Sequence, residues 1–537
     1  MIPSARLPAG GRVPLARPGE RRLALGILCT ILFLTFLDNT VVSVALGSVQ
    51  TQLHAGVSAL QWVVSGYALT FAGAMLAFGM IGDEFGRKRV LLAGVVIFCA
   101  GSLLAALAPN IGVLIAARAV MGLGAAASEP GTLSMLRHLY DDERARTRAL
   151  GVWTAVSGLA LAAGPVIGGA LVGLWNWRGI FWFNLAFGLA ALAAGLLVLP
   201  ENADPDAHRV DVTGAILGVA ALTALIFGII DAESDGFGAS GVLLLLCVAL
   251  LAAVAFFWRE SRAEHPLLDL RYLRVPRFLT AIVVAFCAYF ATFAVFFFTA
   301  LYLQEVVGYD GYKIALVFLP MTALMVTASL LAGRWTAAVG PAWSILAGCV
   351  LFGGGLLATI VTLSASPPVL PLAAALALTG IGIGTTVVPI TSSALSAVPA
   401  ARSGMAASAT NTSREIGAVT GVAILGALVN SQLQSSLTGR LRHLGVPPNF
   451  QALAIHIIET GGIPSSGHTQ GAGGAEAAGH GSLVQQVIQA AYTAFYTGLR
   501  DALILSAVLV LASGAFAWVL LRRRRGQPGP AGAVTGR

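Results

Sequence analysis

The sequence predicts an all-α integral membrane protein, with two bundles of six helices and two further helices inserted between them. Three observations predict this class: the hydropathy, the distribution of basic residues, and a repeated pattern of glycines. Of the 537 residues, 57% are hydrophobic and only 10% are charged, whereas soluble domains carry about 25% charged residues. So few charges cannot cover a protein of this size in water, so most of its surface must lie in lipid.

Fourteen stretches have the length and hydropathy of membrane-crossing helices, each of which needs about 20 apolar residues. The first follows Arg21 and Arg22 and is too long for the apolar region of a signal peptide, which is about 7–15 residues, so we interpret it as a retained helix. In order, the predicted spans are 23–47, 57–80, 90–107, 112–136, 147–172, 179–200, 211–231, 240–258, 278–303, 312–332, 342–364, 369–392, 404–430 and 497–521.

These spans predict five segments of the chain. We expect a cytoplasmic tail over 1–22, a first six-helix bundle over 23–200, and two inserted helices with flanking loops over 201–277. A second six-helix bundle over 278–521 carries a long outer loop at 431–496, and a basic cytoplasmic tail follows at 522–537.

The basic residues support this count and an orientation with both termini in the cytoplasm. Cytoplasmic loops collect Lys and Arg, and 25 of the 32 such residues fall in the predicted inner segments. Topology therefore explains the net charge of +8 better than a nucleic-acid partner does.

No metal or disulfide framework is predicted. Four histidines are spread loosely along the glycine-rich outer loop, which favours a flexible loop over a metal site. All five cysteines lie within apolar runs and lack metal-ligand spacing. The residues concerned are His443, His456, His468 and His480, with Cys29, Cys99, Cys247, Cys287 and Cys349.

An internal repeat is indicated by two inner corners that follow the second and tenth spans. Gly79 and Gly86 stand seven residues apart in the first, and Gly333 and Gly340 do so in the second. The first corner also carries charges that the second lacks. Duplicated halves are common in transporters, which hold the substrate near the membrane midplane between the halves.

Charged residues inside spans are costly in lipid and mark candidate functional sites. Asp38 and Arg118 lie at about the same depth in the outer half of the membrane, judged from a rise of 1.5 Å per residue. Their joining and separation would change the proton affinity of the carboxyl group. The alternative is a static structural pair.

Three further charged residues within spans are candidates. Glu129 precedes Pro130 near the inner end of the fourth span, where it either lines a cavity or reaches interfacial water. Arg414 and Glu415 stand deep in the thirteenth span, where a packing or gating ion pair is the plainer interpretation.

The fifth span combines a proline with small residues that permit close helix packing, as expected at a moving interface. Ordinary use of glycine and proline in membranes is the alternative. The motif comprises Gly158, Gly164, Pro165, Gly168 and Gly169.

Together these motifs resemble the major facilitator superfamily, in particular its fourteen-helix drug:proton antiporter branch. The similar residues include Leu37–Val42 in the first span, Arg118 with Gly122 and Gly124 in the fourth, the fifth-span motif, Trp177–Asn184, Asn411–Gly417, and the loop residues Gly79, Asp83, Gly86, Arg87, Lys88 and Arg89. The resemblance implies that Asp38 and Arg118 couple protons and that the loop forms an inner gate. Asp83 would then contact the start of the thirteenth span.

The sequence departs from the family pattern at the expected substrate cavity. Ser43 and Gly47 replace Asn and Pro, Met121 replaces a polar residue, and Glu129 adds a charge. We therefore take Ser43, Met121, Glu129, Arg414 and Glu415 as cavity candidates.

The resulting hypothesis is a proton-driven exporter of drugs or other toxic amphipathic molecules in a bacterial cytoplasmic membrane. It would act as a monomer without a cofactor and would not be an enzyme. Its partners would be protons, the small-molecule substrate and the bilayer. Alternatives are a dedicated exporter of one metabolite or self-made antibiotic, an uptake symporter, and a membrane-embedded enzyme or sensor.

Overall fold

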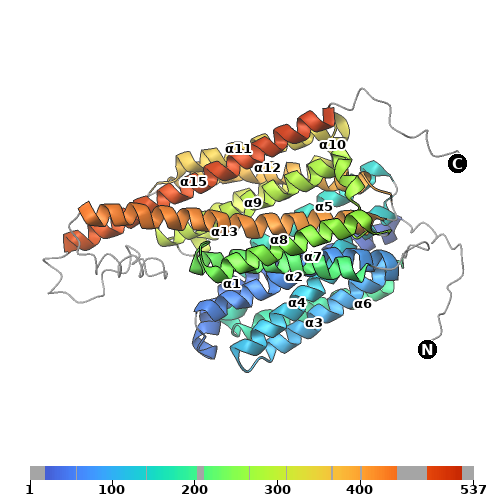
Figure 1. Ribbon diagram of the computed structural model, residues 1–537, viewed down its shortest axis with the longest axis horizontal. Coiled ribbons are helices and arrows are strands. Elements are labelled where there is room, and N and C mark those ends of the chain that lie inside the picture. The colour runs from blue at the N-terminus through green and yellow to red at the C-terminus, as the bar shows by residue number, and fades with distance from the viewer. Residues whose placement is uncertain are drawn as a thin grey trace, which may run out of the picture. The chain divides into compact units, whose positions relative to one another are not determined.

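The computed structural model describes residues 18–55, 57–140, 142–201, 211–264, 266–309, 311–364, 367–399, 402–443 and 481–522. These residues form helices and connecting turns, with no β-strand among them (Figure 1). In chain order the helices are α1 (Pro18–Leu53), α2 (Val57–Phe85), α3 (Arg87–Ala106), α4 (Ile111–Leu139), α5 (Glu143–Leu174), α6 (Arg178–Val198), α7 (Val212–Asp235), α8 (Ser240–Arg262), the short 3₁₀ helix η1 (Leu270–Arg274), α9 (Pro276–Glu305), α10 (Gly311–Val339), α11 (Pro341–Thr362), α12 (Val369–Ser396), α13 (Ser403–His443) and α15 (Gly481–Arg522).

Ten of the described helices are long and apolar enough to cross a membrane, or eleven if the bent α2 is one span. The apolar part of α7 is only Thr213–Ile229, and neither α5 nor α13 is among these helices. The predicted all-helical membrane architecture is therefore confirmed, whereas the count of fourteen spans stays a prediction.

The chain divides into two compact units. The first comprises 1–225, 247–275 and 394–412, and the second comprises 226–246, 276–393 and 413–537. In the first unit, α1 packs against α5 and α6, and α4 packs against α2 and α3. Gly94 and Gly124 let α3 and α4 approach so closely that a Cβ at either position would lie 2.6–2.7 Å from the other's carbonyl oxygen. Small residues at such crossings replace the hydrophobic effect as the source of tight packing in lipid.

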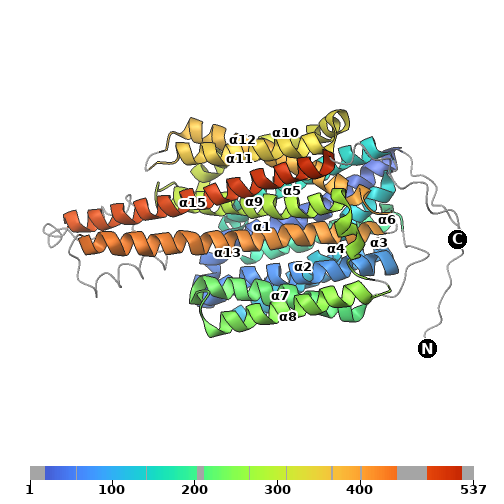
Figure 2. The ribbon, with the colours of Figure 1, turned by 45° about the horizontal axis from the view of Figure 1, so that its top comes forward.

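In the second unit, α15 lies along α9 and α11 (Figure 2). The helix α12 packs closely against α10 and α11. Gly384 faces the backbone of α10 at Met325, and Gly355 of α11 faces the backbone of α12, where an added Cβ would lie 2.5 Å from Thr379 N. Each unit is thus held by helices whose backbones nearly touch.

The two corners that predicted an internal repeat have the same local structure. Gly86 precedes α3 with φ 102°, and Gly340 precedes α11 with φ 86°. Both angles lie in the left-handed region that glycine adopts without a Cβ penalty. The paired glycines therefore mark equivalent turns between consecutive helices.

The connection predicted as a long outer loop begins later and ends earlier than its hydropathy suggests. Helix α13 continues to His443 and α15 begins at Gly481, so both ends of the predicted loop 431–496 are helical. Hydropathy detects the apolar part of a helix, whereas the helix itself continues until its backbone hydrogen bonds stop. The predicted loop histidines at 456, 468 and 480 lie outside the described residues, as does the side chain of His443.

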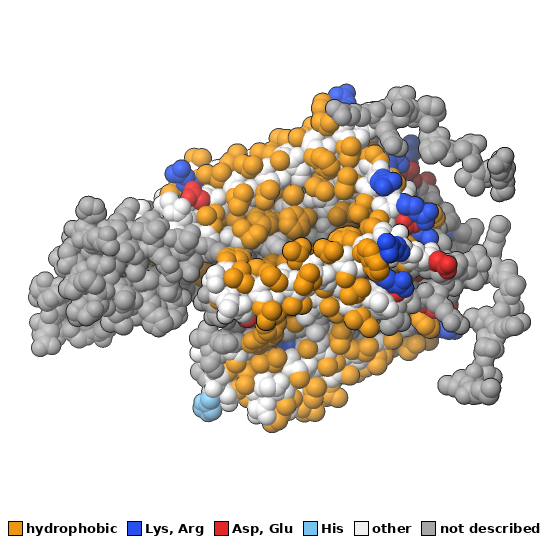
Figure 3. All heavy atoms as spheres, in the orientation of Figure 1, with side chains coloured by type: hydrophobic (Ala, Val, Ile, Leu, Met, Phe, Trp, Pro, Cys, Tyr) orange, Lys and Arg blue, Asp and Glu red, His pale blue; other side chains and the backbone are white. Residues whose placement is uncertain are grey.

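Hydrophobic side chains cover the flanks of the helices on the face shown in Figure 3. Helix α8 illustrates this surface, since Leu244, Leu250 and Leu251 are each about two-thirds exposed. Exposed leucines in such a row are unfavourable in water and favourable in hydrocarbon. They indicate that this side of α8 faces lipid.

Candidate functional site

Asp38 and Arg118 form an ion pair inside the first unit. Asp38 stands on α1 and Arg118 on α4, and both side chains are almost fully buried. Arg118 donates from Nη1 to Oδ2 of the carboxylate. The similar depth predicted for the two residues is therefore realised as direct contact.

Residues from two more helices contact this ion pair. Asn184 of α6 donates from Nδ2 to Oδ1 of Asp38 over 2.7 Å, so both carboxylate oxygens accept a hydrogen bond. Arg118 also donates from Nε to the carbonyl oxygen of Val63 on α2 over 3.0 Å. Its guanidinium carbon lies 4.4 Å from the centre of the Tyr67 ring. Four helices, α1, α2, α4 and α6, thus hold one charged pair.

The chemistry of this arrangement follows from its burial. A carboxylate away from water is costly unless a cation and hydrogen-bond donors compensate it. Arg118 and Asn184 supply that compensation only while they stay in contact with Asp38. Of these partners, sequence analysis missed Tyr67 and assigned no role to Asn184, although an asparagine in an apolar span is itself a signal.

A second polar cluster joins the corner between α2 and α3 to the start of α13. Oδ1 of Asp83 accepts hydrogen bonds from Nε and Nη2 of Arg87 over 2.9 and 2.6 Å. Oδ2 accepts from the backbone N–H of Met405 over 3.3 Å, two residues after α13 begins. The positive end of the helix dipole favours an anion there. The expected contact between Asp83 and the start of the thirteenth span is therefore present.

Glycines make this contact possible. A Cβ on Gly79 would overlap the side chain of Ser408, and a Cβ on Gly404 would lie 2.5 Å from both oxygens of Asp83. With these residues, α2 and α13 approach closely enough for the carboxylate to reach the helix terminus. Gly79, the first glycine of the loop motif, thus allows this contact because it has no side chain to clash with α13.

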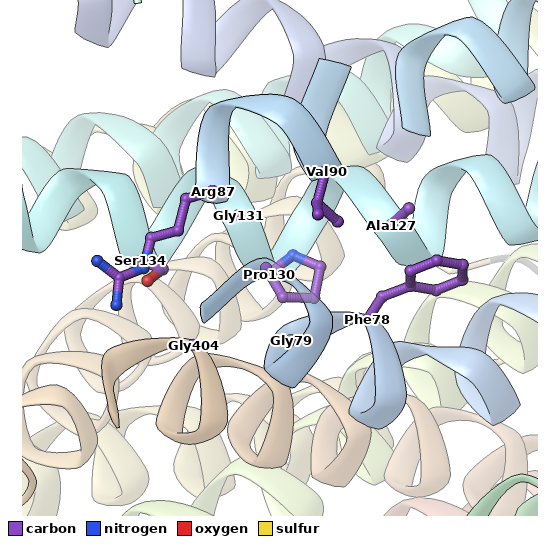
Figure 4. A pocket seen from close by; sticks show the side chains of 10 residues that line it. Phe78, Gly79, Arg87, Val90, Ala127, Pro130, Gly131, Ser134 and Gly404 are labelled. Carbon is purple, nitrogen blue, oxygen red and sulfur yellow. The ribbon is translucent and has the colours of Figure 1, made fainter. Parts of the chain in front are cut away.

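Arg87 has a partner that sequence analysis did not identify. Its Nη1 lies 2.8–3.0 Å from the ring nitrogens of His138 at the end of α4. Arg87 is only 2% exposed, so it spans a buried gap between Asp83 and the imidazole. A small pocket adjoins this cluster, with Arg87 and Ser134 at one end and Phe78 and Ala127 at the other (Figure 4).

The other two basic residues of the predicted gating loop point elsewhere. Lys88 donates from Nζ to the carbonyl oxygen of Leu196 over 2.9 Å. Arg89 forms a solvent-exposed ion pair with Glu201 over 3.3 Å. Both therefore tie the start of α3 to the end of α6, while Asp83 and Arg87 face α13 and α4.

A third cluster, also absent from the sequence predictions, lies beside η1. Asp269 is 4% exposed and accepts hydrogen bonds from Arg402 over 2.6 Å and from Arg271 over 2.8 Å. Burial alone would raise the pKa of this carboxyl group, but hydrogen bonds and charge from Arg271, with the charge of Arg402, outweigh it and lower the pKa below its ordinary value. The cluster fastens the connection after α8 to the residue that precedes α13.

The fifth-span motif packs against α1. A Cβ on Gly164 would overlap the side chain of Thr40, and one on Gly168 would lie 2.8 Å from the carbonyl oxygen of Val41. Gly158 is buried, whereas a Cβ added to Gly169 would have no atom within 4 Å. The side chain of Pro165 lies outside the described residues, and helix α5 runs through this position.

The remaining cavity candidates are divided between the two units. Met121 is buried against Gly101 of α3, and Glu129 is 2% exposed within α4. In the second unit, Arg414 donates to Thr391 and lies 5.3 Å from the centre of the Tyr289 ring. The adjacent residue Glu415 is half-buried, and the side chain of Ser43 lies outside the described residues. A shared role in one cavity stays a prediction.

Comparison with known proteins places these clusters in a family. The family model of the Major Facilitator Superfamily matches residues 28–422. The multidrug resistance protein Stp of Mycobacterium tuberculosis is 34% identical over 430 residues, or 80% of each chain. The tetracenomycin C resistance and export protein of Streptomyces glaucescens is 29% identical, covering 98% of this chain and 94% of its own.

A solved structure agrees on the fold. The bacterial homologue of the human lysosomal transporter Spinster aligns with a TM-score of 0.55 at 17% identity, covering 96% of this chain and all of that one. At this identity the likeness concerns the fold alone. With the family model matching most of the chain and the sequence motifs lying at helix contacts, this multi-pass membrane protein belongs to the major facilitator superfamily.

Proposed function

We propose that this protein exports drugs or other toxic amphipathic small molecules across a bacterial cytoplasmic membrane, in exchange for protons. The observation that carries the proposal is the buried ion pair between Asp38 and Arg118, with Asn184 on the second carboxylate oxygen. A carboxyl group that binds a proton when its partners withdraw is the minimum that proton exchange requires. The functions for which the relatives are named, multidrug resistance and antibiotic export, support the direction and the substrate class.

The proposed cycle assigns different roles to the clusters. Asp38 releases its proton while Arg118 and Asn184 contact it, and takes one up when the helices of the pair move apart. Asp83 at the start of α13 stabilises one arrangement of the inner helix ends, because its hydrogen bond to Met405 exists only when α2 and α13 are close. Ser43, Met121, Glu129, Arg414 and Glu415 remain candidates for substrate contact.

The topology that fits this cycle has fourteen spans with both termini in the cytoplasm, and we propose it for this chain. It includes α5, α7 and α13 as spans whose polar or small residues face other helices. We further propose that the monomer is the functional unit and that the proton gradient is the only energy source.

The test is export by the full-length chain in a pump-deficient bacterium. We expect resistance to a panel of lipophilic cations and efflux of a dye, both lost when an uncoupler collapses the proton gradient. Asp38→Asn should abolish export while insertion is retained, and Glu143→Gln, which removes an exposed carboxylate at the start of α5, should not. Normal export by well-expressed Asp38→Asn would refute the coupling role.

A second candidate is dedicated export of one self-made antibiotic, favoured by the name of the Streptomyces relative that matches nearly the whole chain. The same panel distinguishes the two, since a dedicated exporter would confer resistance to a single compound class. Inside-out vesicles with an imposed pH gradient would separate export from uptake.

A further inference from the structure

An arginine packed against two tryptophans stands where α11 begins and α15 ends, within the second unit. The guanidinium carbon of Arg522 lies 4.6 Å from the centre of the Trp518 ring and 5.1 Å from that of Trp343. The two indole rings meet edge to face, with centres 5.7 Å apart and planes at 70°. Three side chains from two helices thus form one cluster, called here the Trp–Arg cluster.

The cluster is open to its surroundings. Trp343 is 43% exposed, and Arg522 is exposed as well. Among the described residues, the guanidinium of Arg522 has ring contacts but no hydrogen bond or ion pair. The N–H groups of a guanidinium lie in its plane, and contacts with two rings restrict where that group can lie. The exposed Arg522 therefore presents a fork of hydrogen-bond donors to the surroundings of the protein.

The position of the cluster identifies the kind of ligand it meets. The apolar span of α15 runs from Tyr492 to Arg522, so Arg522 stands at the boundary between hydrocarbon and water. Tryptophans gather at this boundary because the indole has an apolar body and a polar edge. At that depth the abundant anions are the phosphate groups of lipids.

We propose that the Trp–Arg cluster is a binding site for the headgroup phosphate of an anionic phospholipid. The Arg522 fork takes two phosphate oxygens, as planar guanidinium groups commonly do. The exposed side of Trp343 lies against the upper acyl chain and glycerol. The basic residues that follow at 523–525 add attraction of longer range, but the oriented arginine distinguishes this site from general charge attraction.

The experiment measures retained lipids on the full-length protein by native mass spectrometry in detergent, with titrated phosphatidylglycerol or phosphatidylcholine. Salt at about 0.5 M screens general attraction, because the Debye length then falls to about 4 Å. We expect Arg522→Gln to weaken binding of phosphatidylglycerol about fivefold, the effect of about 1 kcal/mol per basic residue. Phosphatidylcholine carries the same phosphate beside a choline cation, so it should bind more weakly and lose less on this substitution.

Two variants separate an oriented fork from net charge. Arg522→Lys keeps the charge but loses the planar fork and should weaken binding nearly as much. The double variant Trp343→Leu/Trp518→Leu keeps every charge and should do the same. If Arg522→Lys binds as the wild type does, or if the double variant is unaffected, the proposed site is wrong and net charge explains the binding.

Matched controls complete the test. Arg500→Gln removes another exposed arginine of α15, far along the helix from Arg522, and should leave phosphatidylglycerol binding unchanged. At this salt concentration, neutralising residues 523–525 should weaken phosphatidylglycerol binding less than Arg522→Gln does. A larger effect of neutralising 523–525 would overturn the proposal. Excess inorganic phosphate should not displace the lipid; displacement would instead indicate a site for soluble phosphate. Size-exclusion profiles verify that each variant is folded.

Discussion

Asn184 donates a hydrogen bond to Oδ1 of Asp38 over 2.7 Å, while Arg118 occupies the other carboxylate oxygen. The amide is neutral, so it can stay bonded to the carboxyl group in either protonation state by rotating its oxygen or nitrogen toward it. The arginine can only donate. The two partners of Asp38 therefore differ in how strongly they favour its charged form.

Replacing Asn184 with Ala should lower both stability and export. The lost bond is made to a charged group, for which about 1.5–3 kcal/mol is typical. Thermal unfolding in detergent and dye efflux provide the measurements. Ser102→Ala is the control, because it removes a buried hydrogen bond between α3 and the Phe181 carbonyl oxygen in the same unit. It should lower stability modestly and leave the dependence of export on the proton gradient intact. Equal stability of wild type and Asn184→Ala would contradict the bond.

Arg118→Leu and Asp38→Asn should each destabilise the protein. Removing either partner leaves the other buried group without its main compensation, a change that costs about 3–5 kcal/mol in buried pairs. The double variant Asp38→Asn/Arg118→Leu should recover part of this loss, because it contains no uncompensated charge. A double-mutant cycle of unfolding midpoints measures the coupling, and strictly additive effects would mean that the two residues do not interact in the folded protein.

Two glycines on α5, Gly164 and Gly169, provide a paired test of helix packing. A Cβ on Gly164 would overlap Thr40 of α1, whereas one on Gly169 has open space. Gly164→Ala should therefore lower the unfolding temperature and export, and Gly169→Ala should preserve both. Since alanine favours the helix over glycine by about 1 kcal/mol, Gly169→Ala can even stabilise. Equal tolerance of both substitutions would refute close packing of α1 and α5.

Asp269 predicts a specific pH dependence of stability. Its folded pKa lies below the ordinary value of 3.8, so the unfolded chain binds its proton first as pH falls. The stabilisation is thus fully present above about pH 3.8 and is lost as pH falls through the lower folded value. The stability difference between wild type and Asp269→Asn should be constant from about pH 8 to about pH 5 and shrink only below about pH 4. A difference that varies around neutral pH would point to another group.

Several features of the site could be predicted from sequence because they depend on position along a helix. The similar depths of Asp38 and Arg118 followed from a constant rise per residue, and their contact agrees with that estimate. The turn glycines Gly86 and Gly340 could be found because the backbone there needs a residue without Cβ. Other features could not, because they depend on which side chains from distant segments meet.

By itself, the sequence determined that this protein is a helical membrane protein with charged residues inside its spans. Hydropathy and the high energetic cost of charge in lipid depend on the residues of a single helix, so both can be predicted from the sequence. Only the tertiary structure decided that Asn184 and Tyr67 contact the Asp38–Arg118 pair, that Arg87 meets His138, and that Arg522 packs against two tryptophans. Those partners are set by helix packing between residues far apart in sequence, and no local pattern encodes that packing.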